Sequence, residues 1–135
     1  MIRQIFSKVD HLLLASVIDV NDISSGRHNS ADEQQILQVS AMQLISGQKV
    51  NAHRHLSISR NTTGTQECWV ILTGLVSVQI FDIDQMQIDD FLLSTGTCLT
   101  TYRGGHALQV LQSAKIIEIK NGPYYGAKFD SQSIN

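Results

Sequence analysis

The chain is short of proline, cysteine and long apolar runs, and each shortage excludes a class of structure. Its 135 residues include one proline, Pro123, and two cysteines, Cys68 and Cys98. Two cysteines cannot build the multiple-disulfide framework of small secreted domains. No run of eighteen apolar residues exists, so the sequence predicts no membrane-spanning helix. We expect the two thiols to be buried and reduced, which favours a cytoplasmic location.

Charge is also scarce and evenly divided. Ten lysine and arginine residues stand against twelve aspartate and glutamate residues, which gives a net charge of −2. This distribution forms no basic face, so we expect no nucleic-acid partner. Hydrophobic residues make up 42% of the chain, which is enough to fill the core of one domain.

Residues that favour β-strands recur in short runs separated by turn-forming residues. The expected strands cover residues 2–6, 36–45, 50–59, 67–73, 76–82, 86–93, 98–102, 106–112 and 115–120. Residues 11–17 fit either a strand or a short helix, 21–34 read as a polar loop, and 60–65 read as a hairpin loop. No long helix is predicted. The pattern predicts an all-β sandwich or barrel of antiparallel strands.

Three histidines and one glutamate are candidate metal ligands. His53 and His55 lie two residues apart, so both point to the same face of their expected strand. Glu67 begins a later strand, and His106 follows the glycine pair at 104–105. Three imidazoles and a carboxylate form a ligand set that accepts Zn, Fe, Mn, Ni or Co. The four side chains can share one divalent ion only if the fold brings their strands together with these faces inward.

Two spaced motifs resemble the signatures of the cupin superfamily. The first signature is a glycine, five residues, His-x-His, a gap, a glutamate, six residues and a glycine; here these are Gly47, His53, His55, Glu67 and Gly74. The stretch from Gly96 to His106 is similar to the second signature, which is a glycine, five residues, Pro-x-Gly, two residues and a histidine. The resemblance covers residues 36–120. It implies a jelly-roll cupin barrel, the double-stranded β-helix, with His53, His55, Glu67 and His106 as its metal ligands.

The chain departs from these signatures at three places. Eleven residues separate His55 from Glu67, where three or four are usual, and the excess falls in the expected hairpin loop. Tyr102 replaces the usual proline. One residue, instead of two, lies between Gly104 and His106. A displaced His106 or a local bulge is the expected structural consequence.

The resemblance implies three kinds of function, which the residues do not distinguish. A bound metal leaves coordination positions open, as in a metal-dependent isomerase or dioxygenase. Metal-independent sugar-nucleotide isomerases and epimerases of this superfamily use a histidine base and a tyrosine partner; here His55 or His106 would be the base and Tyr102 the acid. The third kind is a non-catalytic binding barrel. The expected ligand is a small polar molecule of the carbohydrate-derivative class, since the tail is similar to those of small cupins of polysaccharide biosynthesis.

Other residues are pocket candidates, and each also has a simpler interpretation. Trp69 either stacks on a ligand ring or fills the core. Arg60 and Arg103 either bind a phosphate or carboxylate of the ligand or are solvated. Glu118 and Lys120 either act as acid and base or form an exposed ion pair. If the strand register slips by one residue, Gln66 faces the pocket instead of Glu67.

Three segments are expected within the one domain. Residues 1–34 form an N-terminal arm, 35–122 form the barrel, and 123–135 form a tail that packs on or near the barrel opening. The apolar surface of residues 1–20 predicts a homodimer contact. These residues lack a small-residue cleavage site, so they are not interpreted as a signal peptide.

Overall fold

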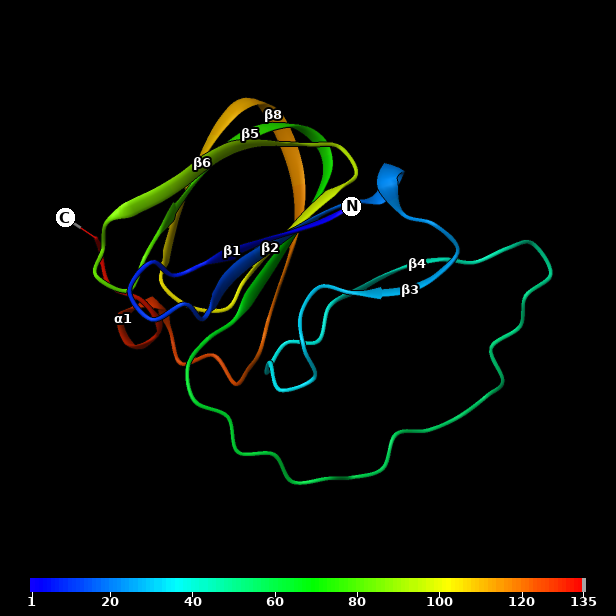
Figure 1. Cartoon of the computed structure of the whole chain (residues 1–135). Helices are drawn as coiled ribbons and strands as arrows, with labels where there is room; N and C mark the ends of the chain where they lie inside the picture. Colours follow the sequence, from blue (N-terminus) through cyan, green and yellow to red (C-terminus); the bar gives the residue numbers. More distant parts are fainter. Residues whose placement is uncertain (135) are drawn as a thin grey trace.

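The computed structural model describes residues 1–134, and strands dominate it (Figure 1). The strands are β1 (Ile2–Phe6), β2 (Leu13–Asp19), β3 (Gly26–Asn29), β4 (Ser40–Gln43), β5 (Glu67–Phe81), β6 (Gln87–Ser94), β7 (Thr97–Thr101) and β8 (Gly105–Lys120). A 3-10 helix at Val20–Asp22 and one turn of α-helix, α1 (Ala127–Asp130), complete the described elements. The prediction of an all-β, antiparallel chain is therefore confirmed.

Six of the strands form one sheet that is organised around β5. One edge of β5 pairs first with β7, through residues 67–70, and then with β6, through residues 75–81. The other edge pairs with β8 along nearly its whole length. β1 and β2 extend the sheet beyond β7, and β3 and β4 form a separate two-stranded sheet. Within residues 1–134 no pairing joins the outer strands to one another, so the sheet is not a closed barrel.

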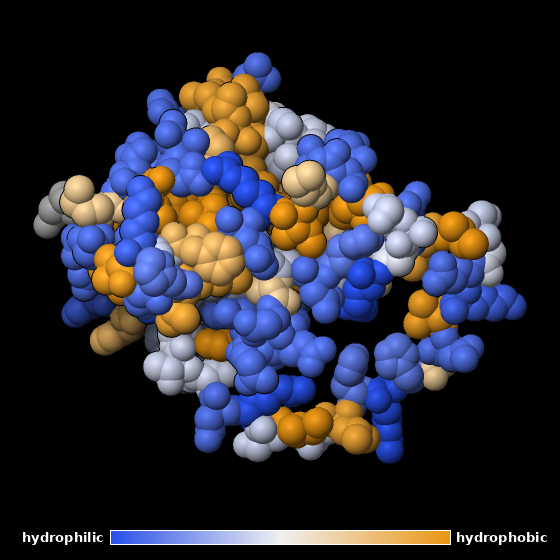
Figure 2. Space-filling view, viewed as in Figure 1, coloured by the Kyte–Doolittle hydropathy of each residue, from blue (hydrophilic) through white to orange (hydrophobic). Residues whose placement is uncertain are grey.

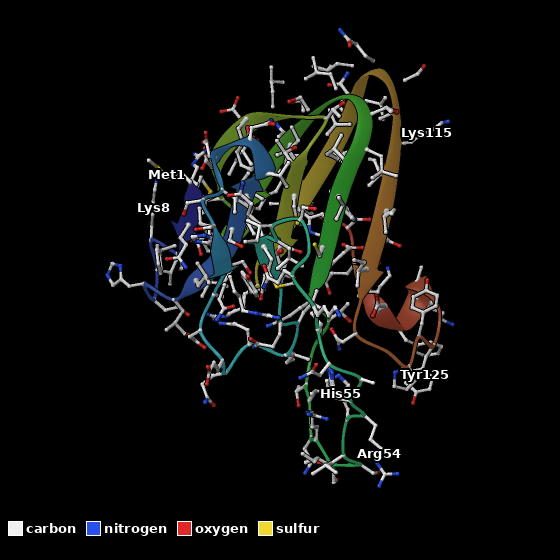
Figure 3. The ribbon with its side chains drawn as sticks, turned by 90° about the vertical axis from the view of Figure 1, so that its right-hand side faces the viewer. Met1, Lys8, Arg54, His55, Lys115 and Tyr125 are labelled. Atoms are coloured by element: carbon white, nitrogen blue, oxygen red, sulfur yellow. The ribbon has the colours of Figure 1, made fainter. Side chains whose placement is uncertain are left out.

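The paired strands β5 and β8 form a long ribbon that folds over at Gly74. The φ angle of Gly74 is +94°, which favours glycine, and the pairing register shifts around it. A side chain at this position would overlap the backbone of Ser113 and Ala114 on β8. Figure 3 shows Lys115 near the apex of the fold, with both arms of the ribbon descending from it. The two ends of the ribbon therefore approach each other.

The bend also changes which residues of β5 face the core. Ile71 lies before Gly74 and Ile80 lies after it, and an unbroken strand would put an odd and an even position on opposite faces. Both nevertheless lie in the main core, which contains Ile5, Ala15, Ile71, Val76, Val78, Ile80, Leu93 and Leu99. His106 lies opposite Ile80 in the β5–β8 ladder. Glu67 and His106 thus face the same interior from opposite ends of the ribbon.

A second, smaller core lies on the other face of the first arm of β5. It contains Ile18, Cys68 and Cys98, and the side chains packed on it are Ile2, Ile23, Leu37, Val39, Ala41 and Val70. Several of these come from the region of the β3–β4 sheet. Residues 20–43 therefore cover the face of β5 that points away from the main core.

The exposed segment, residues 44–65, has no strand and no buried residue. It extends away from the sheet and returns to β5 (Figure 1). Apolar side chains are scattered along it in Figure 2, and five of them are exposed: Leu44, Ile45, Val50, Leu56 and Ile58. The predicted strand at 50–59 and hairpin at 60–65 are wrong, and the predicted strand at 36–45 is reduced to β4. Local alternation in these stretches has no neighbouring strand to pair with, and pairing is what holds a strand.

Residues 21–34, expected as a polar loop, contain the strand β3 because β4 supplies a partner for it. Among the other elements, two expected strands merge into one at two places. Residues 67–73 and 76–82 form the single strand β5, and residues 106–112 and 115–120 form the single strand β8. Residues 11–17 were expected to form either a strand or a short helix. Residues 13–19 form the strand β2, which pairs with β1 and β7. In residues 1–134 no helix has the length and apolar character to cross a membrane.

Candidate functional site

A cavity of about 930 Å³ lies where the two ends of the β5–β8 ribbon meet. Three groups of residues line it. They are the strand residues Glu67, Trp69, Phe81, Thr101, Gly105, His106, Ala107 and Lys120; the connecting residues Thr65, Asp82, Ile83, Gln85, Arg103 and Gly104; and the tail residues Tyr124, Ala127 and Asp130–Ile134. This volume lies within the range of cavities that hold a small organic molecule.

Glu67 and His106 make the central polar contact of this cavity. Glu67 Oε2 lies 3.1 Å from His106 Nε2, although 39 positions separate them in the sequence. His106 pairs with Ile80, which a straight strand would place about 43 Å from Glu67. The fold of the ribbon at Gly74 removes that separation. The hydrogen bond from His106, opposed by burial, lowers the pKa of Glu67 to about 2, so Glu67 is ionised at neutral pH.

Lys120 forms an ion pair with the other carboxylate oxygen of Glu67. Its Nζ is 3.4 Å from Glu67 Oε1 and 3.7 Å from Glu118 Oε2. Burial works against the charged ammonium, but the carboxylates around it outweigh burial and raise the pKa of Lys120. The hydrogen-bonding interaction with ionised Glu67 raises the pKa of Glu118. The predicted pair of Glu118 and Lys120 therefore exists, and it is tied to the cavity through Glu67.

Aromatic rings stand beside these charges. The Trp69 ring meets the His106 ring edge to face, with 4.7 Å between ring centroids, and Trp69 Nε1 donates to Glu118 Oε1 at 3.4 Å. Tyr124 lies under the Lys120 ammonium, 5.3 Å from the ring centroid. Trp69 packs on the main core and also lines the cavity, and its stacking on a ligand ring stays a prediction.

His53 and His55 lie outside the cavity, on the exposed segment. Figure 3 shows His55 and Arg54 on the loop at the end of the molecule opposite Lys115. The two imidazoles lie beside each other, with 5.4 Å between ring centroids. Among residues 1–134 no three His, Cys, Asp or Glu side chains lie close enough to hold one metal ion. Two of the four predicted ligands are thus together in the cavity, and the other two are together elsewhere.

Tyr102, the predicted acid of the metal-independent reaction, lies in the interior. Its side chain is 3% exposed, and its hydroxyl lies 3.0 Å from Ser16 Oγ and 2.7 Å from Ser30 Oγ. It is not among the described residues that line the cavity. In this arrangement Tyr102 ties β2 and the residues before β4 to the end of β7.

The two candidate arginines differ in position. Arg60 is on the exposed segment and does not line the cavity, whereas Arg103 does. Arg103 Nη2 lies 2.7 Å from Asp10 Oδ2, which engages much of its charge in a structural pair. The contact with Arg103 is the main cause of the lowered pKa of Asp10, about 2.

The register of β5 places Glu67, and not Gln66, in the cavity. Gln66 is buried on the other side, where its side-chain oxygen accepts from the Leu37 amide at 2.8 Å. The lining also includes residues that were not singled out in the sequence, chiefly Asp130 and Ile134 of the tail. Thr65 Oγ1 donates to Asp130 Oδ1 at 2.6 Å, which fixes the tail beside the start of β5. The expectation that residues 123–135 pack on or near the opening was the available signal for these tail residues.

Comparisons of this chain with models of known protein families, with curated proteins and with solved structures gave no match. The chemistry of the cavity therefore rests on its own residues. An ionised carboxylate that contacts an imidazole can orient that ring as a general base, and an adjacent ammonium can stabilise a developing negative charge.

Proposed function

We propose that this protein is a cupin-type, small-molecule-binding protein whose ligand is a small polar molecule of the carbohydrate-derivative class. One observation carries the proposal: Glu67 and His106 converge, 3.1 Å apart, in a cavity of about 930 Å³. The cavity combines a carboxylate, an imidazole, an ammonium and the face of an aromatic ring. Sugars and their derivatives are bound by this combination, because their hydroxyls accept and donate hydrogen bonds and their C–H faces stack on aromatic rings.

Acid–base chemistry is the activity that the contacts support directly. Glu67 is ionised and lies against His106, so it can hold the imidazole in one orientation. Lys120 lies on the same carboxylate and can balance negative charge on a ligand. A metal-independent isomerase or epimerase would use His106 as the base. The tyrosine partner would have to be another residue than buried Tyr102, and Tyr124 lines the cavity.

A divalent metal is the second candidate, since Glu67 and His106 offer one oxygen and one nitrogen donor of the expected type. The donor set is incomplete as described, and Lys120 competes for the carboxylate. Completion requires His53 and His55 to reach the cavity. Residues 56–66 connect His55 to Glu67 and span up to about 36 Å when extended, so the chain length permits this closure. The unpaired outer edge of β8 would offer residues 50–59 a strand to pair with.

Elemental analysis separates the two candidates. Protein purified without chelator is compared with the variants His53→Ala, Glu67→Gln and His106→Ala, and with His28→Ala as a control on the β3 strand. A metalloprotein should carry about one ion per chain, and the first three variants should lose it while the control keeps it. Equal metal in all four variants, or none in the natural chain, removes the metal candidate.

Ligand binding tests the proposal itself. Thermal-shift and turnover measurements use metal-stripped protein with a panel of sugar phosphates and nucleotide-linked sugars. Conversion of a keto-sugar that is lost in His106→Ala supports the isomerase, and a melting shift without turnover supports a non-catalytic binding barrel. If no member of the panel shifts the melting temperature of either metal-free or metal-loaded protein, the carbohydrate class is wrong. The homodimer and the cytoplasmic location stay predictions.

A further inference from the structure

The second core contains two thiols in direct contact. Cys68 Sγ and Cys98 Sγ lie 3.1 Å apart, which is closer than two sulfur atoms in van der Waals contact. Cys68 is on β5 and Cys98 is on β7, and both strands hold them on the face opposite the cavity. A disulfide bond is about 2.05 Å long, so the sulfurs need to approach by only about 1 Å to bond.

The strand pairing explains why the two thiols are in contact. In the β5–β7 ladder, Cys68 pairs with Thr100 and Val70 pairs with Cys98, so the two cysteines are diagonal neighbours on one face of adjacent strands. Such neighbours are within side-chain reach across a sheet. The hydroxyl of Thr100, beside Cys68, is buried and has no hydrogen-bond partner among the described residues. An unsatisfied hydroxyl next to two thiols is available to donate to a thiolate.

We propose that Cys68 and Cys98 form a peroxide-sensitive dithiol, which a peroxide oxidises to an intramolecular disulfide. The Cys68 thiolate attacks one oxygen of hydrogen peroxide, which gives a sulfenic acid and hydroxide. Cys98 then attacks the Cys68 sulfur, and the sulfenic hydroxyl leaves as water with the proton of Cys98. Two thiols are oxidised by two electrons, one peroxide is reduced, and two molecules of water form. This modification lies on the opposite face of β5 from the proposed ligand cavity and does not depend on it.

The order of the two steps follows from the environment of each thiol. The hydrogen bond from Cys98 lowers the pKa of Cys68 to about 7 against the effect of burial, and the Thr100 hydroxyl also lowers it. The same hydrogen bond, together with burial, raises the pKa of Cys98. We therefore assign the attack to Cys68, whose pKa the shared hydrogen bond lowers.

Access is the remaining requirement, because Cys68 is 1% exposed and Cys98 is 8% exposed. The side chains packed on the two cysteines include Ile23 and Ala41, which do not belong to the six-stranded sheet. The same two residues also line a hollow of about 320 Å³. Hydrogen peroxide is little larger than water, so the proposed oxidation requires only a small opening of residues 23–41.

The test counts thiols in the full chain after treatment with hydrogen peroxide. The reduced protein is treated, unfolded without reductant and labelled with a maleimide, and its intact mass is measured. We expect both labels to disappear, the mass to fall by two hydrogens, and a peptide map to join Cys68 to Cys98. In the control Cys98→Ser, Cys68 should instead gain oxygen, because no resolving thiol is present.

Three results would overturn the proposal. Both thiols could remain fully labelled at peroxide levels that oxidise free glutathione. The disulfides could join separate chains. Alternatively, Cys68 of the natural chain could gain oxygen as readily as in Cys98→Ser. Reduction with a dithiol should restore both labels, which distinguishes the disulfide from irreversible oxidation.

Discussion

The β5–β8 ribbon and the exposed segment hold the two halves of the predicted ligand set, and they differ in their physical support. Glu67 and His106 lie on paired strands that are packed against the main core. His53 and His55 lie on residues 44–65, where every residue is exposed and no strand forms. Both pairs are internally close, but only the pair on the ribbon is held by long-range backbone pairing. A spaced motif thus identifies candidate residues, whereas strand pairing decides which of them meet.

The largest difference between the two regions should appear when a side chain is truncated in each. Ile71 is 1% exposed in the core, and Leu56 is 73% exposed on the segment. Ile71→Ala should reduce the free energy of unfolding by about 4 kcal/mol because it leaves a cavity. Leu56→Ala should change it by less than about 0.5 kcal/mol. Urea denaturation measures both. A cost above about 1 kcal/mol for Leu56→Ala would show that the segment packs on a surface in solution.

The bend of the ribbon gives a second comparison, between two glycines of similar backbone conformation. Gly74 has φ +94° and Gly64 has φ +87°, but only at Gly74 would a Cβ meet other atoms. Gly74→Ala should cost about 3 kcal/mol, since steric overlap adds to backbone strain. Gly64→Ala carries the strain alone, about 1 kcal/mol. Equal costs in thermal unfolding would mean that the bend does not depend on the missing side chain.

The Glu67 carboxylate should make the ribbon side of the site sensitive to acid. Its pKa is lowered from 4.5 to about 2 in the folded protein, chiefly by the hydrogen bond from His106. The associated stabilisation, about 2 kcal/mol after allowance for coupling, is present above pH 4.5 and is lost as the pH falls toward 2. Glu67→Gln should remove this part of the pH dependence. Glu33→Gln, on an exposed loop, is the control and should leave the profile unchanged; a Glu67→Gln profile that matches it would contradict the assigned pKa.

The smallest effect is expected for the histidines of the exposed segment. In metal-free protein, the double variant His53→Ala, His55→Ala should change the free energy of unfolding by less than about 0.5 kcal/mol, because both side chains are exposed. Circular dichroism during thermal unfolding gives this value. A clear loss of stability without metal would place these histidines in a packed environment and would support closure of residues 50–59 on the sheet.

The sequence predicted the strands in which the alternation of apolar and polar residues agrees with the faces that the folded sheet buries. β1, β6 and β7 fall at or within a residue or two of their expected positions, and Glu67 and His106 share an interior as their strand faces indicated. Gly74 was interpreted as a break between strands because glycine weakens a strand interior. The same residue instead forms a bulge inside one strand, and the sequence alone does not distinguish these outcomes.

The features that the sequence did not predict depend on contacts between residues far apart in the chain, which local sequence patterns do not contain. Residues 50–59 alternate as a strand does, but alternation reports a preference for one face and does not supply a partner. Tyr102 had a suitable chemical group, and its burial against Ser16 and Ser30 comes from the way β2 and β7 pack. The tail residues that line the cavity have no recognisable motif, and their place follows from contacts such as that between Thr65 and Asp130.

The position of Gly74 has a geometric consequence for the contact between Glu67 and His106. Each arm of the ribbon runs about seven residues from the apex to the carboxylate or imidazole, a lever of about 23 Å. A change of roughly 5° in the angle between the arms would shift their ends by about 2 Å relative to each other. The separation of Glu67 and His106 therefore depends on the backbone packing of Gly74 against Ser113, far from either side chain.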